Sequence, residues 1–216
     1  MMTGLHCFGP TTNAVRDPRW GRIKRTWGEC PLLVGQLAAA HIQGIQGNNS
    51  RYTQISADVN MFMVHDGPDA IRTHFSAAVD LYDIYDMYLP GFSAAIADGG
   101  VDSVMVAYSG VNGVPDNANA FLLTHVLQQQ LNFSGVAFSD NGGVVGLYTT
   151  QHYVASPLQA AAAALNAGLH QDMGSGGPGA KGWDFGDTYY AKVKKKKKKR
   201  GGGGGGKERK RKRRKD

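Results

Sequence analysis

Short β-branched segments alternate with longer alanine- and leucine-rich segments, and this alternation is the feature that most restricts the fold of the chain. The pattern predicts strands over residues 55–65, 101–108 and 135–139 and helices over 31–46, 75–97, 118–131 and 157–169. Helices of this length connect strands that run in the same direction. The sequence therefore predicts an α/β fold built on a parallel sheet.

The charge of the chain is divided sharply between its two parts. Positions 1–191 hold eight Lys or Arg and fifteen acidic residues, whereas positions 192–216 hold sixteen basic and two acidic residues. Repulsion among like charges and a run of six glycines favour a disordered, solvated tail. A nucleic-acid arm is the alternative, but no aromatic residue interrupts the basic run. We expect at most non-specific contact with nucleic acid through the tail.

Other sequence signals exclude several classes of protein. The two cysteines form no Cys-x-x-Cys pair, the seven histidines show no ligand spacing with a second donor, and no run of 18 apolar residues occurs. We therefore expect no metal, no cofactor and no membrane span. The first residues also lack the apolar run of a signal peptide.

Three polar blocks occur in order along the chain. They are residues 16–22 (RDPRWGR), 108–113 (YSGVNG) and 139–142 (SDNG). Together they resemble glycoside hydrolase family 3. Further segments that resemble this family, with the closest likeness to its β-xylosidase branch, are 28–32 (GECPL), 72–77 (RTHFSA), 88–92 (YLPGF), 151–153 (QHY), 160–164 (AAAAA) and 167–169 (AGL).

The resemblance implies roles for three residues. Asp140 would be the nucleophile of a retaining hydrolase, Tyr108 would lie beside the reacting carbon, and Arg22 would bind sugar hydroxyls. Each residue also has a structural interpretation: a helix cap for Asp140, core packing for Tyr108, and a salt bridge to Asp17 or Glu29 for Arg22. Trp20 is interpreted as core packing rather than as a sugar platform.

The resemblance also implies a partial (β/α)8 barrel, with functional groups at the carboxyl ends of the strands. Tyr108 and Asp140 both follow predicted strands. A full barrel takes about 250 residues, so we expect the first strands and the end of the barrel to be missing, which would expose a sheet edge. We divide the chain into a barrel fragment over 1–190 and a low-complexity tail over 191–216.

The chain departs from the family at the acid/base residue. Glu29 is the only glutamate before the tail, and its segment does not match an acid/base role. In two-domain members of the family, the general acid comes from a domain downstream of the barrel. Another branch uses a His and an Asp on a barrel loop, which His65 with Asp66 or Asp69 would imitate.

Further departures lie among the expected sugar contacts. Asn60-Met61 stands where the family has a Lys-His pair, Cys30 replaces an aspartate, and Lys24-Arg25 replaces Gln-Glu. Losing hydrogen bonds from charged groups costs roughly 1.5–3 kcal/mol each. We therefore expect weakened affinity for the substrate.

Two functions follow from the resemblance. The first is hydrolysis of β-linked xylosides or glucosides in carbohydrate breakdown, with β-linked oligosaccharides or aryl glycosides as substrates. The second is an inactive or carbohydrate-binding remnant of such an enzyme. The family suggests an extracellular, cell-wall or vacuolar location.

Overall fold

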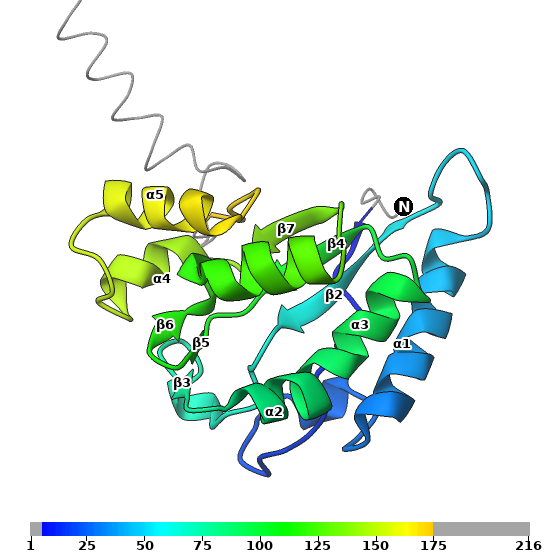
Figure 1. Ribbon diagram of the computed structural model, residues 1–216, viewed down its shortest axis with the longest axis horizontal. Coiled ribbons are helices and arrows are strands. Elements are labelled where there is room, and N and C mark those ends of the chain that lie inside the picture. The colour runs from blue at the N-terminus through cyan, green and yellow to red at the C-terminus, as the bar shows by residue number, and fades with distance from the viewer. Residues whose placement is uncertain (1–5, 175–216) are drawn as a thin grey trace, which may run out of the picture.

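The computed structural model describes residues 6–174 and shows a parallel sheet covered by helices (Figure 1). Four strands lie in the order β1-β2-β4-β7, and every neighbouring pair is parallel. They are β1 (His6–Cys7), β2 (Ser56–Phe62), β4 (Ser103–Val106) and β7 (Val136–Ser139). The spatial order follows the chain order, as it does in the wall of a barrel. The predicted α/β class and partial barrel are confirmed.

The helices follow the expected alternation. The α-helices are α1 (Pro31–Gln46), α2 (Leu81–Asp83), α3 (Leu89–Ala97), α4 (Gly143–Thr149) and α5 (Pro157–Ala167). Pro31 lies in the first turn of α1, and Gly168 ends α5 with a left-handed φ of 103°. In Figure 1, α1 and α3 run side by side along one face of the sheet. None of the helices in residues 6–174 is long and apolar enough to cross a membrane.

The core lies between the helices and one face of the sheet. Val59, Val104 and Ala137 come from three successive strands and pack into one cluster with Ile42 and Phe92 of the helix layer. Their strand neighbours point to the other face, because successive side chains in a strand alternate. This packing fixes which side of each strand faces the interior of the curled sheet.

The sheet curls so that its first and last strands approach each other. The ring of His6 in β1 lies 5.6 Å from the ring of Phe138 in β7, and Phe8 lies 6.2 Å from the same ring. Phe138 also forms a parallel bridge with Gln171. The cavity beside these strands measures about 640 Å³, within the range of roughly 300–1,000 Å³ that is typical of small-molecule sites.

The prediction of one helix over 75–97 is wrong at its start. Ser76–Ala77 forms strand β3, which pairs in parallel with β5 (Gly110–Val111). The helix begins only after Asp80, whose side chain accepts a hydrogen bond from the Asp83 backbone N–H at 2.8 Å. From there the chain runs through a π-helical turn, Ile84–Tyr88, into α3. Asp80 is a helix-start signal that the hydrophobic pattern concealed.

Three further elements differ from expectation. The predicted helix over 118–131 is a π-helix over Phe121–Gln130, preceded by a 3-10 turn over Asp116–Ala118. A hairpin joins β5 to β6 (Val114–Pro115), and α4 follows the turn after β7. Other short 3-10 turns are Ile23–Arg25 and Asp69–Ile71. The predicted boundary at 190 and the basic tail lie outside the described residues.

Candidate functional site

Asp140 lies at the carboxyl end of β7, beside the end of β4. Its backbone N–H donates to the carbonyl of Val106 at 3.1 Å. Its carboxylate accepts a hydrogen bond from the N–H of Asn141 at 2.6 Å. The N-cap of α4 is Gly142, with a left-handed φ of 78°, so Asp140 is not the cap of this helix. The half-buried carboxylate is free of that structural role.

Tyr108 comes from the neighbouring strand end and contacts Asp140. Burial raises the pKa of the Tyr108 hydroxyl, and the charge of Asp140 and a hydrogen bond to its carboxylate raise it further. Gln151 holds the backbone of the tyrosine from the other side, because its Nε2 donates to the Tyr108 carbonyl at 2.5 Å. A hydroxyl that stays protonated beside a carboxylate acts as a hydrogen-bond donor to it.

Arg22 reaches the same place from the loop after β1. Burial lowers the pKa of its guanidinium, neighbouring Arg25 adds to that effect, and the charge of Asp140 opposes it. Arg22 forms no ion pair with Asp17 or Glu29 within residues 6–174. Asp17 instead pairs with Arg19 at 2.6 Å. The structure thus brings Arg22, Tyr108 and Asp140 together from distant parts of the chain.

Asn60 and Met61, which replace the Lys-His pair of the family, lie in the wall beside Arg22. Asn60 is buried and its side-chain oxygen accepts a hydrogen bond from the Thr11 hydroxyl at 2.7 Å. Met61 is buried against Trp20, and its sulfur lies 2.7 Å from Nη1 of Arg22. Trp20 is a packing residue, as its sequence context predicted. The Arg22 guanidinium therefore meets a thioether where the family has an imidazole.

A buried polar chain lies beneath Tyr108. The Ser109 hydroxyl donates to Asp116 at 2.9 Å, and Nδ1 of His65 lies 3.4 Å from the same hydroxyl. Burial and the charge of Arg22 lower the pKa of His65 to about 3, so the imidazole is neutral near pH 7. Sequence reasoning gave no role to Ser109, although it lies in the 108–113 block, and did not single out Asp116, because nothing in their local pattern distinguishes them from turn residues.

His65 does not form the His-Asp pair that its sequence neighbourhood suggested. Asp69 instead forms an ion pair with Arg72 at 3.2 Å. No hydrogen bond joins His65 to Asp66 within the described residues, where Oδ2 of Asp66 has no partner. The expected alternative acid/base pair is therefore not assembled.

A second carboxyl, that of Asp58, lies within electrostatic range of Asp140. Burial raises the pKa of Asp58 well above its usual value, and the charge of Asp140 adds to the increase. The Asp58 side chain is 0% exposed, on β2. A carboxyl enclosed in this way does not reach a glycosidic oxygen. The described residues also contain no group of three His, Cys, Asp or Glu side chains placed to hold a metal.

Among curated proteins, the chain is 37% identical over 180 residues to beta-xylosidase/alpha-L-arabinofuranosidase 2 of Medicago sativa subsp. varia, covering 81% of this chain and 23% of that protein. It is 35% identical over 179 residues to beta-D-xylosidase 1 of Arabidopsis thaliana, covering 80% of this chain and 23% of the relative. The chain thus spans about a quarter of the length of these relatives.

Solved structures show the same relationship. A GH3 exo-beta-xylosidase, XlnD, in complex with a xylobiose aziridine activity-based probe, matches with a TM-score of 0.76 and 29% identity over 80% of this chain and 23% of that one. A beta-glucosidase from Listeria innocua in complex with glucose matches with a TM-score of 0.71 and 32% identity over 77% and 24%. The profile of the glycosyl hydrolase family 3 N terminal domain matches residues 2–175. The chain therefore belongs to glycoside hydrolase family 3, in the region of that N-terminal domain.

Proposed function

We propose that this chain provides the nucleophile of a retaining β-glycosidase that acts on β-linked xylosides or glucosides. The observation that carries the proposal is the position of Asp140, at a strand end, hydrogen-bonded to Tyr108 and within the field of Arg22. Residues from three separate strand-end loops meet there. Such convergence at the carboxyl edge of a curled parallel sheet is typical of barrel active sites.

The proposed chemistry proceeds in two steps. The Asp140 carboxylate attacks the anomeric carbon, a C–O bond to the enzyme forms, and the bond to the leaving oxygen breaks. Water then hydrolyses the glycosyl-enzyme ester and releases the sugar. Tyr108 orients the carboxylate through its hydrogen bond, and Arg22 binds ring hydroxyls through its fork of donors. A second carboxyl, about 5–5.5 Å from the first, protonates the leaving oxygen in such enzymes.

The relatives support xylosides as the first substrates to examine. Several of the curated relatives are named as β-xylosidases, and two are also named as α-L-arabinofuranosidases. The structural neighbours include β-glucosidases as well. A β-xyloside and a β-glucoside with the same aryl leaving group would separate the two preferences.

The test uses an aryl β-xyloside with a strongly acidic phenol, because such a leaving group needs little protonation. We expect a burst of phenol in proportion to the protein, and Asp140→Ala should abolish it. Asp98→Ala, a change at an exposed carboxyl at the end of α3, is the matched control and should retain the burst. Absence of a burst from folded wild-type protein would contradict the proposal.

A non-catalytic, carbohydrate-binding role is the second candidate. It is favoured by the pair Asn60 and Met61, since Asn60 is bonded to Thr11 and Met61 is buried against Trp20. Neither side chain offers the cation or imidazole that the family uses for sugar hydroxyls. A folded protein that binds xylobiose but releases no phenol would favour this role.

A further inference from the structure

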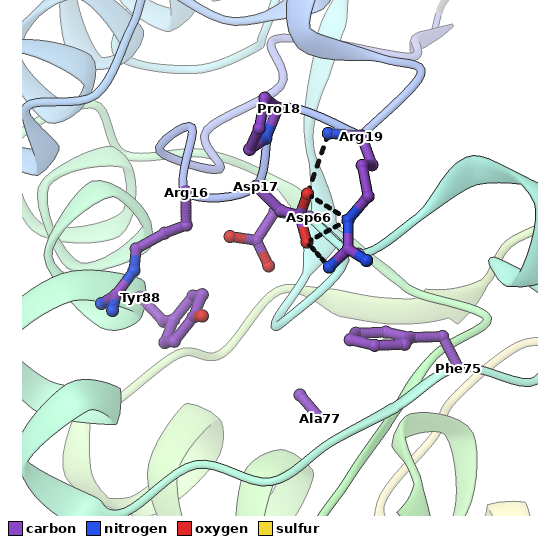
Figure 2. Close-up of a pocket in the computed structure, with 9 residues that line it drawn as sticks. Arg16, Asp17, Pro18, Arg19, Asp66, Phe75, Ala77 and Tyr88 are labelled. Atoms are coloured by element: carbon purple, nitrogen blue, oxygen red, sulfur yellow. Dashed lines mark hydrogen bonds and ion pairs between the residues drawn. The ribbon is translucent and has the colours of Figure 1, made fainter.

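Another cleft is lined by the loops that lead into Arg22 and out of His65. Figure 2 shows the side chains that line it. Its volume is about 480 Å³, which accommodates a single sugar ring. The walls come from the loop before Arg22, the loop after His65, strand β3 and the end of the π-helical turn. The lining residues are Arg16, Asp17, Pro18, Arg19, Asp66, Gly67, Phe75, Ala77 and Tyr88.

The Asp66 carboxyl is the distinctive polar group of this cleft. Figure 2 shows it pointing into the open space, between Arg16 with Tyr88 on one side and Arg19 with Phe75 on the other. The residue is only 4% exposed, and its Oδ2 has no hydrogen-bond partner among residues 6–174. Burying such an oxygen unsatisfied is unfavourable, so a hydroxyl of a bound molecule would stabilise it.

The cations of the cleft are already engaged. Arg19 donates through Nε and Nη2 to both carboxylate oxygens of Asp17, at 2.6–3.2 Å. Arg16 lies 3.4 Å from Asp83, with its guanidinium 5.6 Å from the centre of the Tyr88 ring. An anionic ligand would meet the carboxylates, and a cationic ligand would meet the guanidinium groups. The charge arrangement therefore favours a neutral ligand.

The remaining groups match a polyhydroxylated ring. Asp66 offers an unsatisfied acceptor, and the side chain of Arg19, paired with Asp17, is 72% exposed. Phe75 and Tyr88 supply aromatic surface for the apolar face of the ring. Burial raises the pKa of Asp66 to about 6, which allows its carboxyl to donate as well as to accept near that pH.

We infer that this cleft is an accessory binding site for a neutral pyranose unit, held by Asp66 and packed against Phe75 and Tyr88. The inference rests on the proposed function, because the ligand would be a second unit of the same β-linked oligosaccharide. The two sites share their walls: Asp66 directly follows His65, whose ring lies 6.1 Å from the ring of Tyr108. Arg16 to Arg19 directly precede Trp20 and Arg22.

The test measures binding of xylobiose to the full 216-residue chain by saturation-transfer NMR and calorimetry. The background variant is Asp140→Ala, which removes the proposed nucleophile but leaves the accessory cleft intact. We expect xylobiose still to bind this variant, and Asp66→Leu added to it to weaken binding at least tenfold. Asp86→Leu changes an exposed carboxyl on the π-helical turn Ile84–Tyr88, outside the cleft lining; it is the control and should leave binding unchanged.

Each outcome separates the two proposals. A wild-type protein that gives no phenol burst but loses xylobiose binding on Asp66→Leu would reject the nucleophile and retain the cleft. Xylobiose binding that is unchanged by both Asp66→Leu and Phe75→Ala would overturn the accessory site, as would the absence of any binding to the folded protein. Circular dichroism confirms that each variant is folded.

Discussion

At the scale of single residues, the sequence predicted which side chains meet but not what supports them. Arg22, Tyr108 and Asp140 were chosen through motifs, and their roles stay predictions although the structure brings them together. The chain beneath Tyr108 could not be anticipated, because Ser109 and Asp116 become partners only when the hairpin after β4 folds back. The burial of Ser109 and Asp116 depends on tertiary packing, which the local sequence does not reveal.

Replacing Ser109 by alanine should destabilise the protein and reduce catalysis together. The substitution leaves the fully buried carboxyl of Asp116 without its donor, which costs about 1–3 kcal/mol in unfolding free energy. It also removes the neighbour of His65 beneath the Tyr108 ring, so we expect a slower phenol burst. Urea unfolding and burst kinetics measure the two effects.

The matched control for that change is Ser103→Ala. Ser103 is also buried and donates to the carbonyl of Ala57 at 2.9 Å, but it lies at the start of β4, whereas Ser109 follows the end of that strand. The Ser103→Ala substitution should lower the free energy of unfolding by about 1 kcal/mol and leave the rate of the phenol burst unchanged. Equal effects of both variants on the burst would show that the chain beneath Tyr108 has no specific part in positioning it.

At the scale of elements, the predicted bounds were accurate where a helix had a clear start residue and an apolar stripe, and elements without such signals were missed. Helix α1 has the predicted bounds because Pro31 lies in its first turn and an apolar stripe follows it. The hairpin was missed although Asn112 and Gly113 adopt the positive φ values of 52° and 82° that an Asn-Gly turn favours. Strand β3 has two residues, which is too short for any periodicity to appear.

Helix α5 should depend on its N-cap. The Ser156 hydroxyl accepts a hydrogen bond from the N–H of Gln159 at 3.3 Å, and Ser156→Ala should cost about 1 kcal/mol. The exposed Ser134, in the turn before β7, provides a control in which the same substitution should change stability by less than about 0.5 kcal/mol. Thermal unfolding compares the two, and equal shifts in Tm would argue against the cap.

At the scale of the whole molecule, a parallel sheet curls until aromatic rings from its first and last strands face each other. The alternation of strands and helices predicted the parallel α/β sheet, and the family resemblance implied the partial barrel. The approach of His6 and Phe8 to Phe138 depends on sheet curvature, which no local pattern encodes. The predicted separation of an acidic body from a basic tail remains a prediction, because residues 175–216 lie outside the described part of the chain.

Stability against acid should depend on His65. The pKa of His65 is about 3 in the folded state and 6.5 ordinarily, so the unfolded chain takes up the proton first as the pH falls. The free energy of unfolding therefore keeps its full value above pH 6.5 and decreases as the pH falls towards 3. As the pH falls from 6.5 to 4.5, the unfolding free energy of His65→Phe should rise by about 2–3 kcal/mol relative to that of wild type. Comparing the two proteins at each pH cancels the opposite contribution of Asp66, whose pKa is raised to about 6.

Urea unfolding at a series of pH values measures this difference. His74→Phe, at an exposed histidine, controls for the exchange of a histidine ring for phenylalanine in itself. A stability difference between His65→Phe and wild type that stays constant across this range would show that His65 is not held neutral by burial.

The central claim is that Asp140 forms a covalent bond to the sugar, and trapping that bond tests it most directly. A 2-deoxy-2-fluoro-β-xyloside with a dinitrophenyl leaving group reacts without acid assistance and forms a slowly hydrolysed ester. Peptide mass spectrometry of the treated protein should locate one fluoroxylosyl group on Asp140, and Asp140→Ala should carry none. A label on another residue, or an unlabelled but folded wild-type protein, would contradict the account.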